Sequence, residues 1–365
     1  MRKLAYINAL RGLAIIIVVF SHVQNFGIGL YKMHPYIIPL LDTGLIGVQL
    51  FFILSAFTLF RSYHIRSQYE TGPIKNFFIR RFFRIAPLFY IAIVYYVWQY
   101  NTNPQQTFPV TPLHIISSVA FLNSFSAYWV TSVVPGGWTI GIEMIFYMML
   151  PVLFIYIKNS RQAFNFLVIA ILFRLAIIFL LQIHPLINDV RIWHIFLYFS
   201  FPNQLFVFAF GILMYYIITD DYKMILSPKY MIILCILLIL ETTYRNELFL
   251  SKFFLFNTAL FLFSVAISKF QSKILVNNFF IYIGKISYSV YLVHNAVFYW
   301  LKRFQFIDYI SVTNSETALL NFMIRFIVVM FFSVLIGTVT YNLIEQPFIK
   351  LAERFIKPDR IEEIV

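Results

Sequence analysis

Apolar segments close to the length of a membrane span recur along this chain, and no other feature restricts its fold as strongly. They lie at roughly 7–24, 44–60, 85–100, 138–157, 163–183, 203–219, 229–243, 253–267, 282–301 and 319–343. About 20 apolar residues in a helix cross the hydrocarbon core of a bilayer. Inside that core only helices and closed barrels satisfy every backbone hydrogen bond. The sequence therefore predicts an all-α polytopic membrane protein with about ten transmembrane helices in a single bundle.

The composition agrees with this fold class. Of the 365 residues, 61% are hydrophobic and 12% are charged, whereas a soluble domain is about 25% charged. A weaker apolar stretch at 112–129 is predicted to be a re-entrant or interfacial helix, because a span there would invert every later segment. We expect one transmembrane domain over 1–352 and a tail over 353–365, with no further domain.

The distribution of Lys and Arg predicts the orientation. With a cytoplasmic N-terminus, most of the 28 Lys and Arg fall on the cytoplasmic side, and residues 101–137 contain none. Both termini are therefore expected in the cytoplasm. The net charge of +13 follows from this topology, so no nucleic-acid partner is expected. Three arginines, Arg11, Arg174 and Arg325, lie inside predicted spans.

The first apolar segment carries two ionisable side chains, Arg11 near one end and His22 near the other. Such groups at membrane depth are costly, so each is a candidate functional residue that faces protein or water. On a helix the two share a stripe with Asn8, Ile15 and Val18, and they lie roughly 16 Å apart along its axis. The segment thus offers a fixed cation near one membrane face and a titratable imidazole near the other.

Three arginines lie close together at the start of the third segment, at positions 80, 81 and 84. Arg80 and Arg84 share a helix face, with Arg81 beside them. One interpretation is a topology signal that contacts anionic lipid heads. The other is a cytoplasmic seat for a phosphate-bearing ligand, because guanidinium groups bind phosphates through paired hydrogen bonds.

A break at Pro135, Gly136 and Gly137 precedes a predicted helix that begins at Trp138 and carries Glu143 and Tyr147 on one face. Glu143 could be the structural partner of an arginine or could orient a nearby histidine. The predicted topology places Glu143 and His22 in the same half of the membrane, which favours the second role.

The ninth segment places Ser287, Tyr291 and His294 at helical spacing. Hydrogen bonding between helices is the default explanation for a polar face of this kind, while His294 near mid-membrane could also contact substrate. The single cysteine, Cys235, allows no intrachain disulfide. Because the sequence lacks the usual spacings of metal ligands, no metal is expected.

Six stretches of the chain are informative when taken together. They are INALRGLAIIIVVFSH, GVQLFFILSAFTLF, FFIRRFFRIAPLFY, GGWTIGIEMIFYMMLPVL, IGKISYSVYLVHN and YNLIEQPF. In order and spacing, from about residue 4 to 352, they resemble the acyltransferase 3 family of membrane acyltransferases. Two positions depart from the family pattern: Asn8 stands where an acidic residue is common, and Ala56 stands where glycine is usual.

This resemblance implies an enzyme that moves an acyl group, most often acetyl, from cytoplasmic acyl-CoA to a hydroxyl of a cell-surface glycan. It implies a multi-pass protein of the bacterial inner membrane. Some members carry a C-terminal extracytoplasmic domain. None is expected here, so the chain would acylate its glycan directly or act with separate glycan-assembly proteins. The glycan could be lipopolysaccharide O-antigen, capsule, exopolysaccharide or peptidoglycan.

The candidate site combines the resemblance with the residues themselves. His22 is the expected general base and Glu143 its orienting partner, with an acyl-histidine relay as a variant. The cofactor-binding candidates for acyl-CoA are Arg11, Arg80, Arg81 and Arg84, and the substrate-binding candidates are Trp138, Tyr147, Tyr291 and His294. The competing function is a transporter or flippase for a glycan precursor, in which the intramembrane charges line a path.

Overall fold

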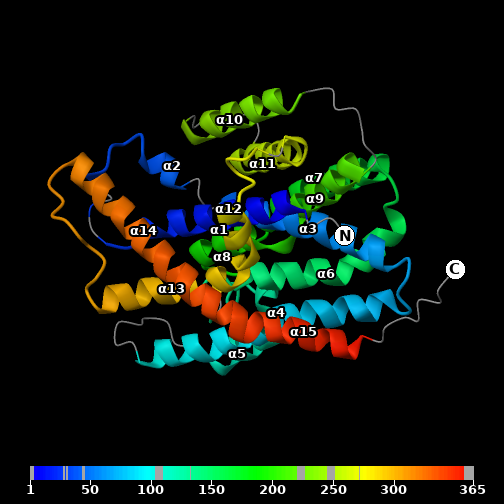
Figure 1. Cartoon of the computed structure of the whole chain (residues 1–365), viewed down its shortest axis with the longest axis horizontal. Helices are drawn as coiled ribbons and strands as arrows, with labels where there is room; N and C mark the ends of the chain where they lie inside the picture. Colours follow the sequence, from blue (N-terminus) through cyan, green and yellow to red (C-terminus); the bar gives the residue numbers. More distant parts are fainter. Residues whose placement is uncertain are drawn as a thin grey trace. The chain divides into compact units, whose positions relative to one another are not determined.

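A computed structural model describes residues 4–27, 29, 32–42, 46–102, 110–131, 133–219, 227–244, 251–270 and 272–356. Helices make up most of this part of the chain, and no strand occurs in it (Figure 1). The predicted all-α class is therefore confirmed. The two termini and most of the predicted tail, from 357 to 365, lie outside the described residues.

The chain divides into two compact units. The first unit comprises residues 1–54 and 218–339, and the second comprises residues 55–217 and 340–365. The boundaries fall inside three helices, α3, α9 and α14, so the same continuous helices contribute to both units.

The first unit is built around α1. Its helices are α1 (Ala5–Val23), α2 (Ile38–Asp42), the start of α3 (Ile46–Arg66), α10 (Pro228–Tyr244), α11 (Lys252–Lys269), α12 (Asn278–Lys285), α13 (Ser287–Arg303) and most of α14 (Ser315–Thr340). Helix α1 packs along α12 through Gly12 and Gly284. A Cβ atom at Gly12 would overlap the carbonyl of Phe280, and one at Gly284 would overlap the carbonyl of Asn8. The two backbones are therefore in direct contact, as small residues allow in membrane helices.

The second unit contains the remaining helices. They are the rest of α3, α4 (Pro73–Thr102), α5 (Pro112–Val119), the short 3-10 turn η3 (Asn123–Phe125), α6 (Trp138–Tyr156), α7 (Ser160–Ile183), α8 (Val190–Phe199), most of α9 (Phe201–Thr219), the π-helical turn η4 (Tyr341–Glu345) and α15 (Gln346–Phe355). Helix α15 packs along α4. It continues past the domain boundary predicted at residue 352.

Polar side chains define where several helices begin. Asn159 caps α7, Asp189 caps α8 and Asn277 caps α12, each by accepting a hydrogen bond from a backbone N–H in the first turn. Such caps satisfy donors that have no partner within the helix. They explain why these apolar helices start where they do.

Seven helical stretches among the described residues are long and apolar enough to cross a membrane. The predicted number of ten is therefore not confirmed. Of the other three predicted segments, 85–100 lies in α4, whose first turns are basic, and 229–243 lies in α10, which is shorter. The third, 282–301, is interrupted at Ile286, where α12 ends and α13 begins.

The predicted re-entrant or interfacial segment forms only a short helix. Helix α5 has eight residues, or about 12 Å, which is too short to span a hydrocarbon core of about 30 Å. The chain then turns at Phe121, whose φ of 59° lies in the left-handed region. This turn leads into η3, which contacts both α5 and α6.

Candidate functional site

Two histidines lie together in the first unit. His22 is in the last turn of α1, and His294 is in α13. Their ring centroids are 5.2 Å apart in an edge-to-face arrangement. His294 is 1% exposed, while His22 is half-buried. The sequence predicted both residues as candidates but did not predict that they form a pair.

Backbone carbonyls determine which ring nitrogen of each histidine carries a proton. His22 Nδ1 is 2.7 Å from the carbonyl oxygen of Val18, and His294 Nδ1 is 2.6 Å from that of Tyr291. Since a carbonyl can only accept, each Nδ1 is the donor. Nε2 of each neutral ring is then the basic nitrogen.

The two Nε2 atoms differ in their surroundings. Asn295 Nδ2 lies 3.1 Å from His294 Nε2, so in the neutral ring both nitrogens of His294 have partners. Nε2 of His22 has no hydrogen bond to any residue of the described part of the chain. His22 is therefore the member of the pair whose basic nitrogen is available for a further hydrogen bond.

A stacked pair of phenylalanines lies four residues beyond the two histidines. Phe26 and Phe298 stack with their centroids 4.2 Å apart and their planes 5° from parallel. Each phenylalanine follows its histidine by four residues. On the other side of α1, Phe20 packs edge-on against Phe322 of α14. These contacts set the positions of the imidazoles.

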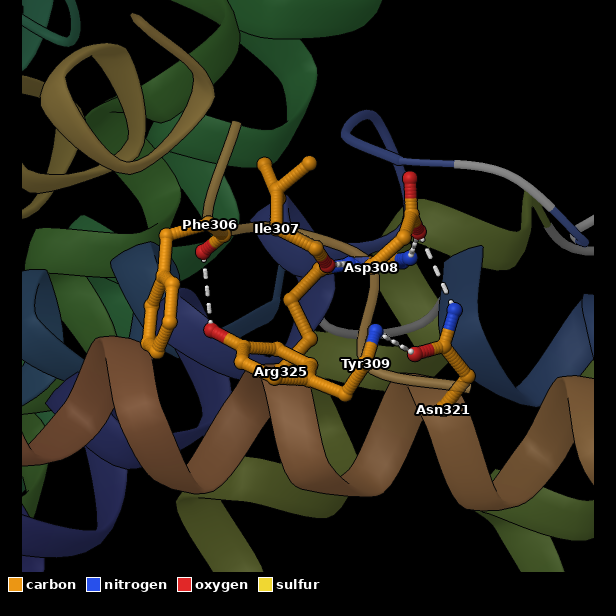
Figure 2. Close-up of polar contacts among 6 residues, drawn as sticks. All are labelled: Phe306, Ile307, Asp308, Tyr309, Asn321 and Arg325. Carbon is orange, nitrogen blue, oxygen red and sulfur yellow. Dashed lines mark hydrogen bonds and ion pairs between the residues drawn. The ribbon is translucent and has the colours of Figure 1, made fainter. Parts of the chain in front are cut away.

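A buried arginine of the first unit anchors the loop before α14 (Figure 2). Arg325 of α14 is 3% exposed. Its Nε donates to the carbonyl of Ile307 at 2.8 Å, and its Nη2 forms an ion pair with Asp308. Asn321 donates to the same carboxylate at 3.0 Å and accepts from the backbone N–H of Tyr309 at 2.9 Å. The loop before α14 is thus bound to that helix by four polar contacts.

Gly27 connects this network to α1. Its φ of +77° is in the left-handed region, and a Cβ atom there would overlap the guanidinium of Arg325. Lys32 adds a second link, because its Nζ donates to the carbonyl of Val312 at 2.8 Å. Burial raises the pKa of the Tyr309 phenol in this loop, Arg325 opposes the shift, and Asp308 adds to it.

The arginine cluster lies on α4 in the second unit, and its members have different surroundings. Arg80 Nη2 is 2.7 Å from Glu70 Oε2, and Arg66 Nη1 is 3.3 Å from Glu70 Oε1. Burial opposes ionisation of the Glu70 carboxyl. Hydrogen bonds from Arg80, Asn76 and Arg66, with the charge of Arg80, outweigh burial and lower its pKa. Arg80 is therefore already engaged by a carboxylate.

The other two arginines lie near the polar face of α6. The guanidinium of Arg81 is 5.8 Å from the ring centroid of Phe77. Both Arg81 and Arg84 are close enough to Tyr147 to interact with it electrostatically. The Tyr147 hydroxyl donates to Glu143 Oε2 at 2.9 Å. Glu143, predicted as a partner of His22, thus belongs locally to the surroundings of Arg81 and Arg84.

The remaining predicted residues are packed within their own units. Trp138 stacks on Phe199 with centroids 4.2 Å apart. The ring of Tyr291 lies 5.7 Å from that of His294, and Arg11 is half-buried on α1. The first unit therefore holds Arg11, His22, Tyr291 and His294, whereas the second holds Arg80, Arg81, Arg84, Trp138, Glu143 and Tyr147.

The sequence analysis did not predict the roles of two carboxylates. Glu70 engages Arg80, and Asp308 engages Arg325. The four-residue spacing of Arg66 and Glu70 was the available signal for the first pair. An arginine inside an apolar segment, as at Arg325, requires a partner, but nothing in the sequence indicated that Asp308 would supply it.

Comparison with known proteins gives one match. Residues 4–342 match the model of the acyltransferase 3 family, which is described as an acyltransferase domain. Neither the curated proteins nor the solved structures contain a match to this chain.

Proposed function

The chain belongs to the acyltransferase 3 family, and from that premise we propose that it transfers an acetyl group from cytoplasmic acyl-CoA to a hydroxyl of a cell-surface glycan. The family and the apolar helices make it a multi-pass membrane acyltransferase. The donor, the acceptor and an inner-membrane location with cytoplasmic termini belong to the proposal. The observation that carries it is the single tautomer of His22, which leaves Nε2 as a base.

In this mechanism His22 acts as the general base. Nε2 accepts the proton of the glycan hydroxyl while the hydroxyl oxygen attacks the acyl carbon. As the carbon–sulfur bond breaks, the imidazolium returns a proton to the departing sulfur, and neutral His22 is restored. Nδ1 donates to the Val18 carbonyl throughout, so the ring keeps its orientation. An acyl-histidine relay would use the same nitrogen as a nucleophile.

The arginines of α4 are proposed to bind the phosphates of the donor. Arg81 and Arg84 are the primary candidates, because Arg80 is engaged by Glu70. Guanidinium groups suit this role, since their paired donors match phosphate oxygens. Acyl-CoA supplies both the phosphates and the activated thioester.

Glu143 is proposed to act at the phosphate site through Tyr147. Its hydrogen bond with Tyr147, and the proximity of that residue to Arg81 and Arg84, support this role. Orientation of His22 by Glu143 is the alternative, and it predicts a changed pH profile in the Glu143→Gln variant.

Membranes that contain the protein and labelled acetyl-CoA provide the test. We expect His22→Ala to reduce transfer of label to glycan by about 10²–10⁴-fold, the usual contribution of a general base. Binding of CoA should be retained. His34→Ala is the control, because His34 belongs to the same unit and is exposed. Full transfer by the His22→Ala variant would refute the mechanism. Absence of O-acetyl signals from glycan of a deletion strain, measured by NMR, would identify the acceptor.

A further inference from the structure

A buried side chain in the second unit has hydrogen-bonding capacity that the protein does not use. Asn123 in η3 is 0% exposed, and neither its Nδ2 nor its Oδ1 has a hydrogen-bond partner. Two other buried amide side chains, Gln204 and Asn257, lack a partner at the oxygen, but their nitrogens donate to backbone carbonyls. Buried polar groups are normally paired, so an amide unpaired at both ends requires an explanation.

The backbone around Asn123 holds this amide in place. The left-handed turn at Phe121 is closed by a 2.7 Å hydrogen bond from Leu122 N to the Ser117 carbonyl. The Phe121 ring stacks against Phe89 of α4 at 5.6 Å. On the other side, the Ser124 hydroxyl donates to the carbonyl of Trp138 at 3.1 Å. Asn123 therefore lies on a short turn fixed to both α4 and α6.

Gly141 of α6 leaves room for the amide. A Cβ atom at Gly141 would lie 2.8 Å from Asn123 Oδ1 and would overlap Ser124 Oγ. The amide thus lies against bare backbone, between Trp138 and Glu143 in the sequence of α6. Both of these residues are candidates from the family motif, so the unused amide adjoins the helical turn that carries them.

The surroundings indicate the class of group that would bind. Ser117, Ser118 and Ser124 are buried near Asn123 in the sequence, and all three are neutral. Their hydroxyls are satisfied by backbone carbonyls. An amide whose nitrogen and oxygen are both unpaired matches a neutral group that can accept one hydrogen bond and donate another. An anion would use Nδ2 but would be repelled by Oδ1.

We propose that Asn123 is a binding point for a neutral donor–acceptor group of a substrate. This inference rests on the proposed function. Within that reaction two groups have the required chemistry: a hydroxyl of the glycan acceptor and an amide of the pantetheine arm of CoA. Asn123 pairs with either through one donated and one accepted hydrogen bond.

The Asn123→Leu variant separates binding from stability. Leucine has a similar size and removes an unsatisfied amide, so the melting temperature should be unchanged or higher. Affinity should nevertheless fall about tenfold, the effect of one hydrogen bond of about 1.4 kcal/mol. We would measure Kd for CoA by calorimetry, and KM for the polysaccharide extracted from a deletion strain. A weaker Kd for CoA identifies the pantetheine amide, and a higher KM for polysaccharide identifies the hydroxyl.

Asn203→Leu is the matched control. Asn203 is also buried in the second unit, but Oδ1 accepts from Arg174 at 2.8 Å and Nδ2 donates to the Tyr198 carbonyl at 2.8 Å. Because its amide is already paired, its loss should lower the melting temperature and leave Kd and KM unchanged.

Unchanged Kd and KM in Asn123→Leu would overturn the inference, whatever the melting temperature. If that variant does not fold, Asn123→Ala is subjected to the same measurements and the same criterion. Wild-type protein that neither binds CoA nor transfers label would refute the proposed function itself, and the inference would fall with it. Normal wild-type kinetics together with an unaffected Asn123 variant would refute the binding point alone.

Discussion

The two units use their polar residues in opposite ways. In the first unit, the His22–His294 pair is held by backbone carbonyls and aromatic rings. In the second unit, Glu70 engages Arg80 of α4, while Arg81 and Arg84 lie near Tyr147. A base needs a fixed lone pair, and an anion site needs excess positive charge. The difference between the units matches these two requirements.

Removal of the positive charges of Arg81 and Arg84 should have the largest effect on CoA binding. The Arg81→Gln/Arg84→Gln double variant should weaken the Kd for CoA by about 100-fold, because each charged hydrogen bond contributes about 1.5 kcal/mol or more. The His22→Ala variant should bind CoA like the wild type. Equal losses of CoA binding in both variants would remove the functional distinction between the units.

Replacement of His294 tests whether the first unit contains one base or two. His294→Phe retains an aromatic ring beside His22 but removes both nitrogens. Because those nitrogens already have partners, we expect transfer to fall by less than about tenfold, well below the loss of a general base. A loss as large as that of His22→Ala would make His294 a second base. A higher KM for polysaccharide alone would make it a substrate contact.

The Glu143→Gln variant tests whether Glu143 acts at the phosphate site or orients His22. Glutamine can still accept from Tyr147 but removes a negative charge from the surroundings of Arg81 and Arg84. Binding of CoA should therefore tighten by about three- to fivefold, which corresponds to about 1 kcal/mol, the interaction of two unit charges about 4 Å apart in water. The pH profile of transfer should stay as in the wild type. A shifted profile with unchanged Kd would instead support orientation of His22.

The last prediction concerns the stability of the fold near Glu70 and not binding or transfer. Because the pKa of Glu70 is lowered in the folded protein, its ionised form stabilises the fold. That contribution is fully present above the ordinary carboxyl value of about 4.3 and is lost as the pH falls through the lower folded value. Glu70→Gln should therefore lower the melting temperature at pH 7, by an amount equivalent to about 1–3 kcal/mol. The difference from wild type should shrink toward pH 3. A pH-independent difference would contradict this account.

The sequence allowed the helical class and most helix positions to be predicted, because apolar length and helix caps are local properties. For example, α6 begins at Trp138 as predicted. The break at Ile286 was not predicted, since the residues on both sides are equally compatible with a continuous helix. The predicted number of ten spans stays unconfirmed, because the segment at 282–301 is interrupted, α4 begins with basic turns and α10 is short.

The candidate site was predicted less completely. The positions of His22 and Arg81 followed from charges inside or beside apolar segments, which are rare enough to be noticed. The pairing of His22 with His294 depends on the packing of helices that are far apart in the chain. Asn123 could not be predicted either, because the absence of hydrogen-bond partners depends on which residues surround the amide in the folded protein.

The close contact between Gly12 and Gly284 fixes the tilt of α1 against α12, and this tilt determines where His22 lies. His22 lies ten residues beyond Gly12, or about 15 Å along a rigid helix. A methyl group at Gly12 that tilted α1 by about 4° would swing the imidazole by roughly 1 Å, a displacement that can slow an enzyme about 100-fold. Under the proposed mechanism, a substitution at Gly12 would therefore slow transfer although Gly12 lies about 15 Å from His22.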